Sequence, residues 1–535
     1  MAYTSVTLSH CQLIKSVYTI ALYDIFPISS KYLSFIIFMD FHIYNTLTRQ
    51  KELFVPREEG KVKIYSCWPT VYGDPHIGNL RAFATAWLLG DTLRALGYKV
   101  EHTMNITDVG HLTDDGDHGE DKMEKGSRKE WLTARDVARK YEDNFRKYIK
   151  ELGIYFDYHP RATDHIQAQI DIVQLLEDKW YTYNITGDGV YMDTSKVSWY
   201  GKLLPPKHLA WIQSGERVED VGKKNPTDFA LRKFSPEGQK RQMERESPRG
   251  VWFPGRHIEC SAMARATLWD FLDIHTWGID HIPVHHTNEI AQSECGFTWG
   301  KKRVNYWVHC QFLNIDAAKI SKSLGNVFSL PDIQAKWFDA LDLRYFYLQA
   351  HYRSFQDFTR ESLEAAQKGR KWLQKKIQDV LSSFWESEAT EESRNFSKGL
   401  ETMSASSLRN DLTDAFVANL LDDVLQAITD DLDTVKLLAS LNHHLNAIIK
   451  NKLSINTKEL LVVIHWLDSH ILKIWLLDTP EKIHIPADIQ SIAQARRDAK
   501  IAKDYSTADE LRKELHTAGR DMLDGKDGFA VVLKS

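Results

Sequence analysis

Two expected strands joined by one helix, within residues 62–106, constrain the fold of this chain more than any other feature. Residues 62–67 alternate apolar and polar side chains in the manner of a strand. A turn rich in Pro and Gly leads into a helical stretch at residues 79–96, and Gly97 stands where a glycine commonly ends a helix. Residues 98–106 form the second strand. Because strands joined by a helix pair in parallel, the pattern predicts an α/β fold with helices on the faces of a parallel sheet.

Composition narrows the class of protein. The 535 residues are 43% hydrophobic, which is enough for large cores and excludes a disordered or collagen-like chain. The net charge of −5 excludes a polybasic protein but not a local basic surface for nucleic acid. Five widely spaced cysteines do not make a disulfide framework, so we expect a reducing, cytoplasmic compartment. The apolar residues 17–39 are interrupted by Asp24, Pro27 and Lys31, and we expect no membrane span.

The pattern changes along the chain. Residues 1–38 resemble the rest neither in polarity nor in periodicity, and we expect a non-native extension or a disordered tail ahead of Met39. A polar, charge-rich insertion is predicted at about residues 110–250, and a second α/β stretch at 254–315. Beyond residue 334 amphipathic helices replace the strands, with a highly charged helical tail at 489–518.

The first candidate motif is Pro-His-Ile-Gly-Asn at residues 75–79, between the first expected strand and the helix. Gly78 lets a ligand approach the backbone, and the N–H groups at a helix N-terminus favour phosphate. His76 can stabilise the charge that develops on a transferring phosphate. A plain loop before a helix has a similar composition, so this short motif is weak by itself.

The second motif, Lys-Ile-Ser-Lys-Ser-Leu-Gly-Asn at residues 319–326, follows the second α/β stretch. Lys319 and Lys322 flank small hydroxyl residues in a glycine-containing loop, which is typical of a mobile clamp for a triphosphate. The alternative is a solvated basic turn. The two motifs at the two ends of one parallel-sheet domain are far more specific together than either is alone.

Four further residues have the side chains that zinc prefers. Cys67 ends the first strand, and Cys260 lies in the run His-Ile-Glu-Cys-Ser-Ala-Met at 257–263. If residues 285–294 are helical, the spacing of four places His285 and Glu289 on one face. Two thiolates, one imidazole and one carboxylate make a plausible zinc set. Taken singly, each has a structural alternative, since a buried free cysteine is usually a small hydrophobic residue.

The two motifs resemble the HIGH and KMSKS signatures of class I aminoacyl-tRNA synthetases. From about Met39 to the end the chain resembles the cysteinyl-tRNA synthetase family in particular, through residues 65–67, 69–72, 257–263 and 285–294. The resemblance implies an α/β Rossmann-like catalytic domain at 39–330 with the insertion, then a linking segment and tRNA-binding helical bundle at 331–480. A small C-terminal domain that contacts the anticodon end is expected at 481–535.

The resemblance also implies the chemistry. One Zn²⁺ per subunit would be held by Cys67, Cys260, His285 and Glu289 and would bind the sulfur of the substrate L-cysteine; His286 is the less favoured neighbour. ATP with Mg²⁺ converts cysteine to cysteinyl-adenylate, which then reacts with the 3′ end of tRNA(Cys). Catalytic roles fall to His76, Asn79, Lys319 and Lys322, and ATP contacts to His76, Gly78, Asn79 and Lys322. Thr70, His275 and Asp280 are assigned to the substrate pocket.

The helical half is expected to bind tRNA, and the protein to act as a monomer. Within the charged tail, residues 495–519 would form the contact surface through Arg496, Arg497, Lys500, Lys503, Arg512 and Lys513. The alternative for this tail is a solvated amphipathic helix laced with ion pairs, and the sequence does not decide between the two.

Some residues depart from the family pattern. Trp68 and Trp277 stand where the family has glycine around the cysteine pocket, and Trp131, Trp180, Trp211, Trp252, Trp269 and Trp337 also occupy usual glycine positions. Arg232, Arg249 and Arg256 stand where the family has tryptophan. Glycine numbers 27, against roughly 37 expected for this length, while tryptophan numbers 16. These facts lead to the hypothesis that codons meaning glycine were translated as tryptophan.

Three functions remain in competition. The favoured one is a cysteine–tRNA ligase. A mycothiol-type paralogue would activate cysteine and pass it to an amino sugar, but it predicts no tRNA-binding half. An inactive tRNA-binding paralogue would have its pocket blocked by Trp68 and Trp277. Cysteine-dependent ATP–pyrophosphate exchange separates the third from the first two, and tRNA charging separates those from each other.

Overall fold

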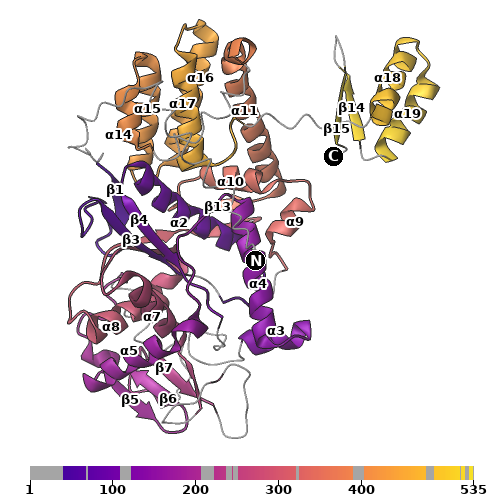
Figure 1. Cartoon of the computed structure of the whole chain (residues 1–535). Coiled ribbons are helices and arrows are strands. Elements are labelled where there is room, and N and C mark those ends of the chain that lie inside the picture. The colour runs from indigo at the N-terminus through magenta and orange to yellow at the C-terminus, as the bar shows by residue number, and fades with distance from the viewer. Residues whose placement is uncertain are drawn as a thin grey trace, which may run out of the picture.

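The structure is a computed structural model (Figure 1). It describes residues 40–67, 70–108, 122–205, 222–235, 244, 251–320, 325–388, 403–477, 487–517, 520–524 and 529–533. The tail expected at 1–38, together with Trp68, Trp211, Arg249 and Lys322, lies outside these ranges. Within the described residues, no helix is both long enough and apolar enough to cross a membrane.

A four-stranded sheet forms the centre of the catalytic part, as the strand–helix–strand pattern predicted. Its strands are β3 (Lys61–Ser66), β4 (Lys99–Met104), β9 (Leu272–Gly278) and β10 (Val304–Cys310), in the spatial order β10-β9-β3-β4, and every pair is parallel. Helix α2 (Ile77–Ala95) makes the crossover from β3 to β4. Gly97 follows it with φ +99°, in the conformation that the expected helix end requires.

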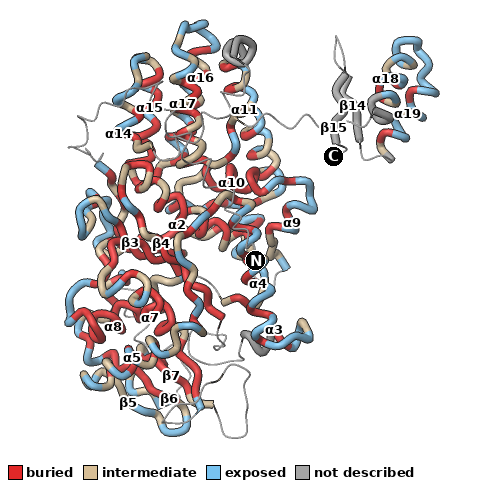
Figure 2. The backbone as a smooth tube through the Cα atoms, in the orientation of Figure 1, coloured by how far each residue is buried: buried red, intermediate tan, exposed pale blue. Residues whose placement is uncertain are grey.

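The crossover helix α2 is buried on nearly all sides. Figure 2 shows the helix as mostly buried beside buried strands. Four of its large side chains are fully buried: Leu80, Phe83, Trp87 and Leu89. One continuous apolar core extends from this sheet into the helical part of the chain. The sheet and the helical part therefore share one hydrophobic core around α2 and are not separate domains joined by a linker.

The insertion has its own antiparallel sheet and its own small core. Strands β5 (Thr182–Ile185), β6 (Gly189–Met192), β7 (Phe229–Phe234) and β8 (Trp252–Pro254) pair in sequence order. Three helices precede them, α3 (Lys122–Glu130), α4 (Ala134–Glu151) and α5 (Ile166–Asp178). Side chains of α5, β6 and β7 pack against α7 (Arg256–Leu268) and α8 (Thr287–Gly296). The insertion thus supports the two helices that carry the candidate zinc ligands.

Smaller sheets surround the centre. Strands β1 (His42–Asn45) and β2 (Gln50–Leu53) form a hairpin. Strand β11 (Leu313–Ile315) pairs antiparallel with β12 (Ala318–Lys319) and parallel with β13 (Gln356–Phe358). The strand at 356–358 lies in the region where the sequence favoured helices over strands. It connects the segment that carries Lys319 to the start of the helical half.

The helical half follows the sequence expectation. Its helices are α9 (Leu330–Gln334), α10 (Ala340–Leu348), α11 (Arg360–Glu388), α14 (Ala405–Asp411), α15 (Ala415–Thr429), α16 (Thr434–Asn451) and α17 (Thr457–Leu467), followed by the π-helical turn η7 (Asp468–Leu472). Figure 1 shows α11, α14, α15, α16 and α17 standing side by side above the sheet.

The charged tail is helical, as the sequence predicted, and is divided into two helices. It consists of α18 (Ala487–Ile501) and α19 (Tyr505–Thr517), with Lys503 between them at φ +62°, and the hairpin β14 (Arg520–Asp524) and β15 (Phe529–Leu533) follows. A left-handed residue reverses the chain direction, so the two helices pack against each other.

Arg344 on α10 joins the helical half to the catalytic part. Its guanidinium donates to the carbonyl oxygen of Leu152, at 2.7 Å, and to that of Leu472, and it lies 4.0 Å above the ring of Trp87. Burial lowers the pKa of Arg344 to about 9, which leaves the side chain charged at neutral pH. The cation is thus held by two carbonyl dipoles and an aromatic face.

Replacing this arginine should weaken the whole body. We expect Arg344→Met to lower the free energy of unfolding by about 2–4 kcal/mol, because two buried carbonyls lose their donor. The matched control is Arg360→Met, which removes an exposed ion pair with Glu364 and should change the free energy by less than about 0.5 kcal/mol. Urea unfolding measures both. Equal losses in the two variants would contradict the role of Arg344.

Candidate active site and metal centre

His76 is the N-terminal cap of α2. Its Nδ1 accepts a hydrogen bond from the backbone N–H of Asn79 at 3.2 Å, and its own N–H donates to Oδ1 of Asn79 at 3.2 Å. Because Nδ1 is the acceptor, the neutral ring carries its proton on Nε2. Asn79 therefore orients the ring of His76. The N–H dipoles of the first turn of α2 point out of the same helix N-terminus that His76 caps.

The two sequence motifs are in contact. A Cβ added to Gly78 would lie 2.8 Å from Cδ1 of Ile320, inside the Lys-Ile-Ser-Lys-Ser motif. The backbone N–H of Ile77 donates to the carbonyl oxygen of Phe328 at 2.8 Å, and Asn326 donates through Nδ2 to the carbonyl oxygen of Lys319 at 3.1 Å. Gly78 thus lets the side chain of Ile320 in the second motif lie close to the start of α2.

A pocket of about 180 Å³ lies between the motifs. Its walls include His76, Gly78, Asn79, Trp277, Asp280 and Lys319. The structure therefore brings together the nucleotide residues that the sequence predicted, apart from Lys322, which lies outside the described residues. Lys319 is exposed, with Nζ 5.5 Å from the ring centre of Phe312.

Asp280 places a negative charge at the edge of this pocket. Burial would raise its pKa, but the neighbouring His281, with Nδ1 3.3 Å from Oδ2 of Asp280, lowers the pKa of Asp280 to about 2. The carboxylate folds back over Gly278, where an added Cβ would lie 2.3 Å from Oδ1. The carboxylate is therefore ionised at neutral pH and suited to accept from an ammonium or hydroxyl group.

Cys67, Cys260, His285 and Glu289 converge in the buried interior. From Sγ of Cys67 the distances are 3.8 Å to Sγ of Cys260, 3.4 Å to Nε2 of His285 and 3.5 Å to Oε1 of Glu289. Nε2 of His285 lies 2.9 Å from Oε1 of Glu289. All four donor atoms lie within 4.8 Å of one another. This is the spacing expected of four ligands around one metal ion.

Each ligand comes from a different part of the fold. Cys67 directly follows β3, Cys260 lies in α7, and Glu289 lies in the first turn of α8. His285 lies in the π-helical turn η5 (Ile282–His286) that precedes α8. The spacing argument for residues 285–294 was conditional on a helix; residues 285 and 286 belong to the wider turn, and α8 begins at residue 287. The predicted contact between residues 285 and 289 is nevertheless formed.

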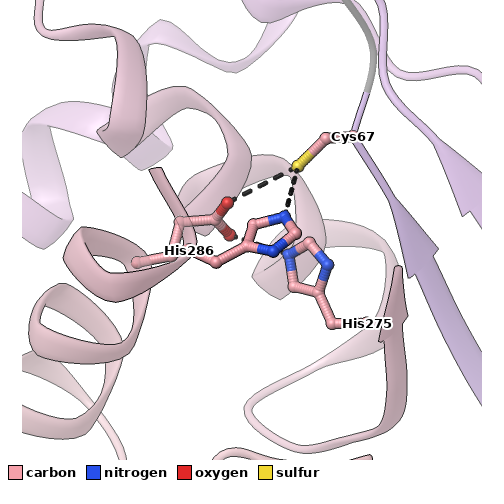
Figure 3. A group of neighbouring side chains, drawn as sticks. Cys67, His275 and His286 are labelled. Atoms are coloured by element: carbon pink, nitrogen blue, oxygen red, sulfur yellow. Dashed lines mark hydrogen bonds and ion pairs between the residues drawn. The ribbon is translucent and has the colours of Figure 1, made fainter. Parts of the chain in front are cut away.

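A second set of ligands overlaps the first. Nε2 of His286 lies 3.5 Å from Sγ of Cys67, and Nε2 of His275 lies 3.0 Å from Oε2 of Glu289, so Cys67, His275, His286 and Glu289 also converge. Figure 3 shows Cys67 bonded on one side to the imidazole of His286, with His275 beyond it. The geometry thus places His286 as near to Cys67 as His285, although the sequence favoured His285.

Further histidines surround the cluster. Nδ1 of His286 lies 2.8 Å from Nε2 of His309, whose Nδ1 lies 2.8 Å from the hydroxyl of Thr46. Nδ1 of His285 lies 2.8 Å from Nδ1 of His257. Sequence reasoning missed His257, His281 and His309 as parts of the site, although His257 lies in the run that carries Cys260. Their proximity depends on pairing between distant strands and helices.

The two remaining pocket predictions have different outcomes. His275, assigned to the substrate pocket, lies in the metal cluster and stacks on Trp307 with ring centres 4.7 Å apart. Thr70 lies where residues 70 and 107 form an isolated parallel bridge, just beyond the ends of β3 and β4. Only Asp280 of the three is on the wall of the pocket described above.

The two thiols form an asymmetric pair. Burial and the hydrogen bond to Cys260 raise the pKa of Cys67, whereas the hydrogen bond from Cys67 lowers the pKa of Cys260 to about 6. Burial would lower the pKa of His285, but Cys260 and Glu289 raise it to about 9. The pocket thus holds one thiolate and one imidazolium near neutral pH. A divalent cation satisfies the same negative groups by displacing these protons.

Comparison with known proteins shows the family to which this chain belongs. The family described as the class I (C) tRNA synthetase catalytic domain matches residues 53–368. A cysteine–tRNA ligase of Treponema denticola is 40% identical over 495 residues, covering 90% of this chain and 97% of that protein. One of Clostridioides difficile is 37% identical over 496 residues, covering 91% and 98%. The solved methionyl-tRNA synthetase of Mycobacterium tuberculosis with methionyl-adenylate shares the fold, with a TM-score of 0.53 at 14% identity over 77% of this chain and 90% of that chain.

The parallel sheet, with the two motifs meeting at the start of its crossover helix, is the catalytic domain of a class I aminoacyl-tRNA synthetase. The relatives extend the match through the helical half to nearly the full length of both chains. The chain belongs to the cysteine–tRNA ligase family.

The contact between the motifs can be tested at Gly78. We expect Gly78→Ala to lower the rate of ATP–pyrophosphate exchange by about 100-fold, because the added methyl group displaces Ile320 and the ring of His76. Gly73→Ala is the matched control, since an added Cβ there meets nothing within 4 Å. Equal rates for the two variants would show that the close approach of Gly78 is not required.

Proposed function

We propose that this chain activates L-cysteine with ATP and transfers it to the 3′ end of tRNA(Cys), with a zinc ion selecting the amino acid. The observation that carries the proposal is the buried Cys/His/Glu cluster, which begins at the carboxyl end of β3 and adjoins the loop leading to His76. Ligands of open parallel sheets bind at the carboxyl ends of strands. The amino-acid and nucleotide subsites therefore lie on one edge of the sheet.

The cluster is suited to zinc. It offers two sulfurs, one imidazole and one carboxylate, all buried, and one of the thiols already has its pKa lowered to about 6. When bound, zinc supplies a Lewis acid that holds the thiolate of the substrate, which a serine hydroxyl matches poorly. Binding through an atom that the competing amino acid lacks gives large discrimination without editing.

We assign the zinc ligands to Cys67, Cys260, His285 and Glu289 rather than to the overlapping set. Only this set contains both thiols, and sulfur is the donor that favours zinc most. His275 then acts on Glu289, to which its Nε2 is bonded, and His286 acts through its contact with His309. These two histidines would orient the site rather than bind the metal.

The choice between the two histidines is testable. His285→Ala should lower the zinc content of the purified protein from about one ion per chain to well below half, because the metal loses an inner ligand. His286→Ala, the matched control at the adjacent position, should retain most of its zinc. Elemental analysis measures both, alongside unfolding curves that confirm folding. The reverse order of zinc contents would assign the metal to the second set.

Activation would proceed by positioning and charge stabilisation. The cysteine carboxylate attacks the α-phosphorus of ATP, and pyrophosphate leaves with its Mg²⁺. His76 donates from Nε2 to the phosphate oxygens, the N-terminus of α2 contributes its dipole, and Asn79 holds the imidazole. Lys319 and Lys322 neutralise the β- and γ-phosphates from the second motif. Asp280 accepts from the ammonium group of the amino acid.

The helical half supports transfer to tRNA. Its relatives in the cysteine–tRNA ligase family match this half as well as the catalytic domain, and a paralogue that passes cysteine to an amino sugar has no need of it. On α18 and α19, Lys500, Arg512 and Lys513 are exposed and would contact RNA phosphates. Arg496, predicted to belong to this surface, is only 7% exposed and offers little of its side chain to RNA. We propose that the enzyme acts as a monomer.

The function is tested by two assays on one preparation. We expect cysteine-dependent ATP–pyrophosphate exchange and charging of tRNA(Cys), with serine inactive in both. His76→Ala should lower the exchange rate by about 100-fold while leaving the zinc content unchanged, because the ring stabilises transition-state charge away from the metal. Exchange without charging would favour the amino-sugar ligase. tRNA binding without exchange would favour the inactive paralogue.

A further inference from the structure

Six tryptophans adopt a backbone conformation that L-residues with large side chains avoid. Their φ angles are +53° to +74°, at Trp131, Trp180, Trp269, Trp299, Trp337 and Trp475. Left-handed φ values of this kind suit glycine and, less often, asparagine or aspartate. Among the described non-glycine residues with positive φ, no other amino acid occurs as often. Sequence comparison with the family had singled out four of the six, and Trp299 and Trp475 are new.

Trp180 occupies a type of helix end that is occupied by glycine after α2 and α4 and by Lys503 after α18. After α2 and α4, Gly97 and Gly153 donate to the carbonyl three residues back, and the next residue donates to the carbonyl five residues before it. Trp180 repeats both bonds after α5: its N–H donates to Glu177 at 2.9 Å, and that of Tyr181 donates to Leu176 at 3.0 Å. This bonding pattern requires a left-handed residue, for which glycine is the usual choice.

Trp269 is the most extreme of the six. It ends α7 with φ +74° and ψ −166°, a region that is essentially restricted to glycine. Its N–H donates to the carbonyl of Arg265 at 2.9 Å, so the conformation is fixed by the helix it closes. Any Cβ at this position is strained.

The side chains at these positions are largely solvent-exposed. The six exposed fractions run from 55% at Trp475 to 94% at Trp131. Burial of an indole normally offsets backbone strain, and here little burial is available to do so. Trp372 provides the contrast: it is 53% exposed but lies within α11, and Nζ of Lys376 is 3.2 Å from its ring centre.

We propose that the polypeptide made in its native cell carries glycine at residues 131, 180, 269, 299, 337 and 475, through a codon that the cell reads as glycine. The proposal extends to Trp277 on a different observation. Trp277 has the largest side chain on the wall of the nucleotide pocket, whose 180 Å³ is below the roughly 300–1,000 Å³ usual for organic ligands. Glycine there opens the space beside His76.

The direct test is mass spectrometry of the protein purified from its native cells. The tryptic peptide 266–301 contains positions 269, 277 and 299, and the peptide 337–344 begins at position 337. We expect each to have the mass of the glycine form, while the buried Trp87 and Trp307 remain tryptophan. Tryptophan in both peptides would overturn the proposal. Trp87 and Trp307 should also have a different codon from the other seven positions.

Stability of recombinant protein gives an independent test of the backbone argument. Trp269→Gly and Trp180→Gly should each raise the unfolding temperature by about 1–2 °C over the matching alanine variants, because alanine keeps the Cβ that strains a left-handed residue. Trp372→Gly should lower the unfolding temperature instead, because its position is helical. Glycine no better than alanine at both positions 180 and 269 would contradict the assignment.

Activity tests position 277 separately. Trp277→Gly should raise the rate of cysteine-dependent ATP–pyrophosphate exchange by about 10-fold or more over the recombinant protein that carries Trp277, because the substrate gains room beside His76. Trp372→Gly serves as the control, since it lies outside the site and should leave the rate unchanged. A lower rate in Trp277→Gly would show that the indole belongs to the working pocket.

Discussion

The parallel pairing of β3 with β9 is the constraint on which the site depends. Its register sets Ser66 against Thr276, and the next residue along, Cys67, donates its N–H to the carbonyl of Thr276 at 3.4 Å. This places the first thiol beside the strand end that leads to Asp280 and then to the ligand turn η5. If the register slipped by one residue, Cys67 would point to the other face of the sheet. The positions of Cys67 and of Asp280 therefore both depend on the short run of backbone hydrogen bonds between β3 and β9.

The interior around Cys67 has an unusual concentration of polar groups for a buried place. Glu289 is 1% exposed, and although burial would raise its pKa, His275 and His285 lower it below the usual range. A buried carboxylate is costly unless it is paired, and here each of its oxygens contacts an imidazole. The supporting imidazoles of His257 and His309 are buried in turn, with their pKa values lowered by burial. Such an arrangement is suited to hold a cation.

The nucleotide motif is also hydrogen-bonded to the helical half. The hydroxyl of Tyr347 on α10 donates to the carbonyl of Ile77 at 2.7 Å, one residue from His76. Asp431, between α15 and α16, accepts from the backbone N–H of Tyr44 at 2.8 Å, from the hydroxyl of Tyr352 and from Arg353. These bonds join the helices to both ends of the catalytic domain.

The sequence alone determined the parallel sheet, the helical second half, the two nucleotide motifs and the four zinc-type side chains. These follow from local periodicity and from residue types, which do not depend on distant partners. Trp180 and Trp337 could be placed at helix ends for the same reason. The sequence could not show that His286 and His275 reach the cluster, that Arg496 is buried, or that Trp299 and Trp475 are left-handed. Those outcomes were decided only by tertiary structure, because strand register, a π-helical turn and helix-to-helix packing set which residues meet and which backbone angles the chain must adopt.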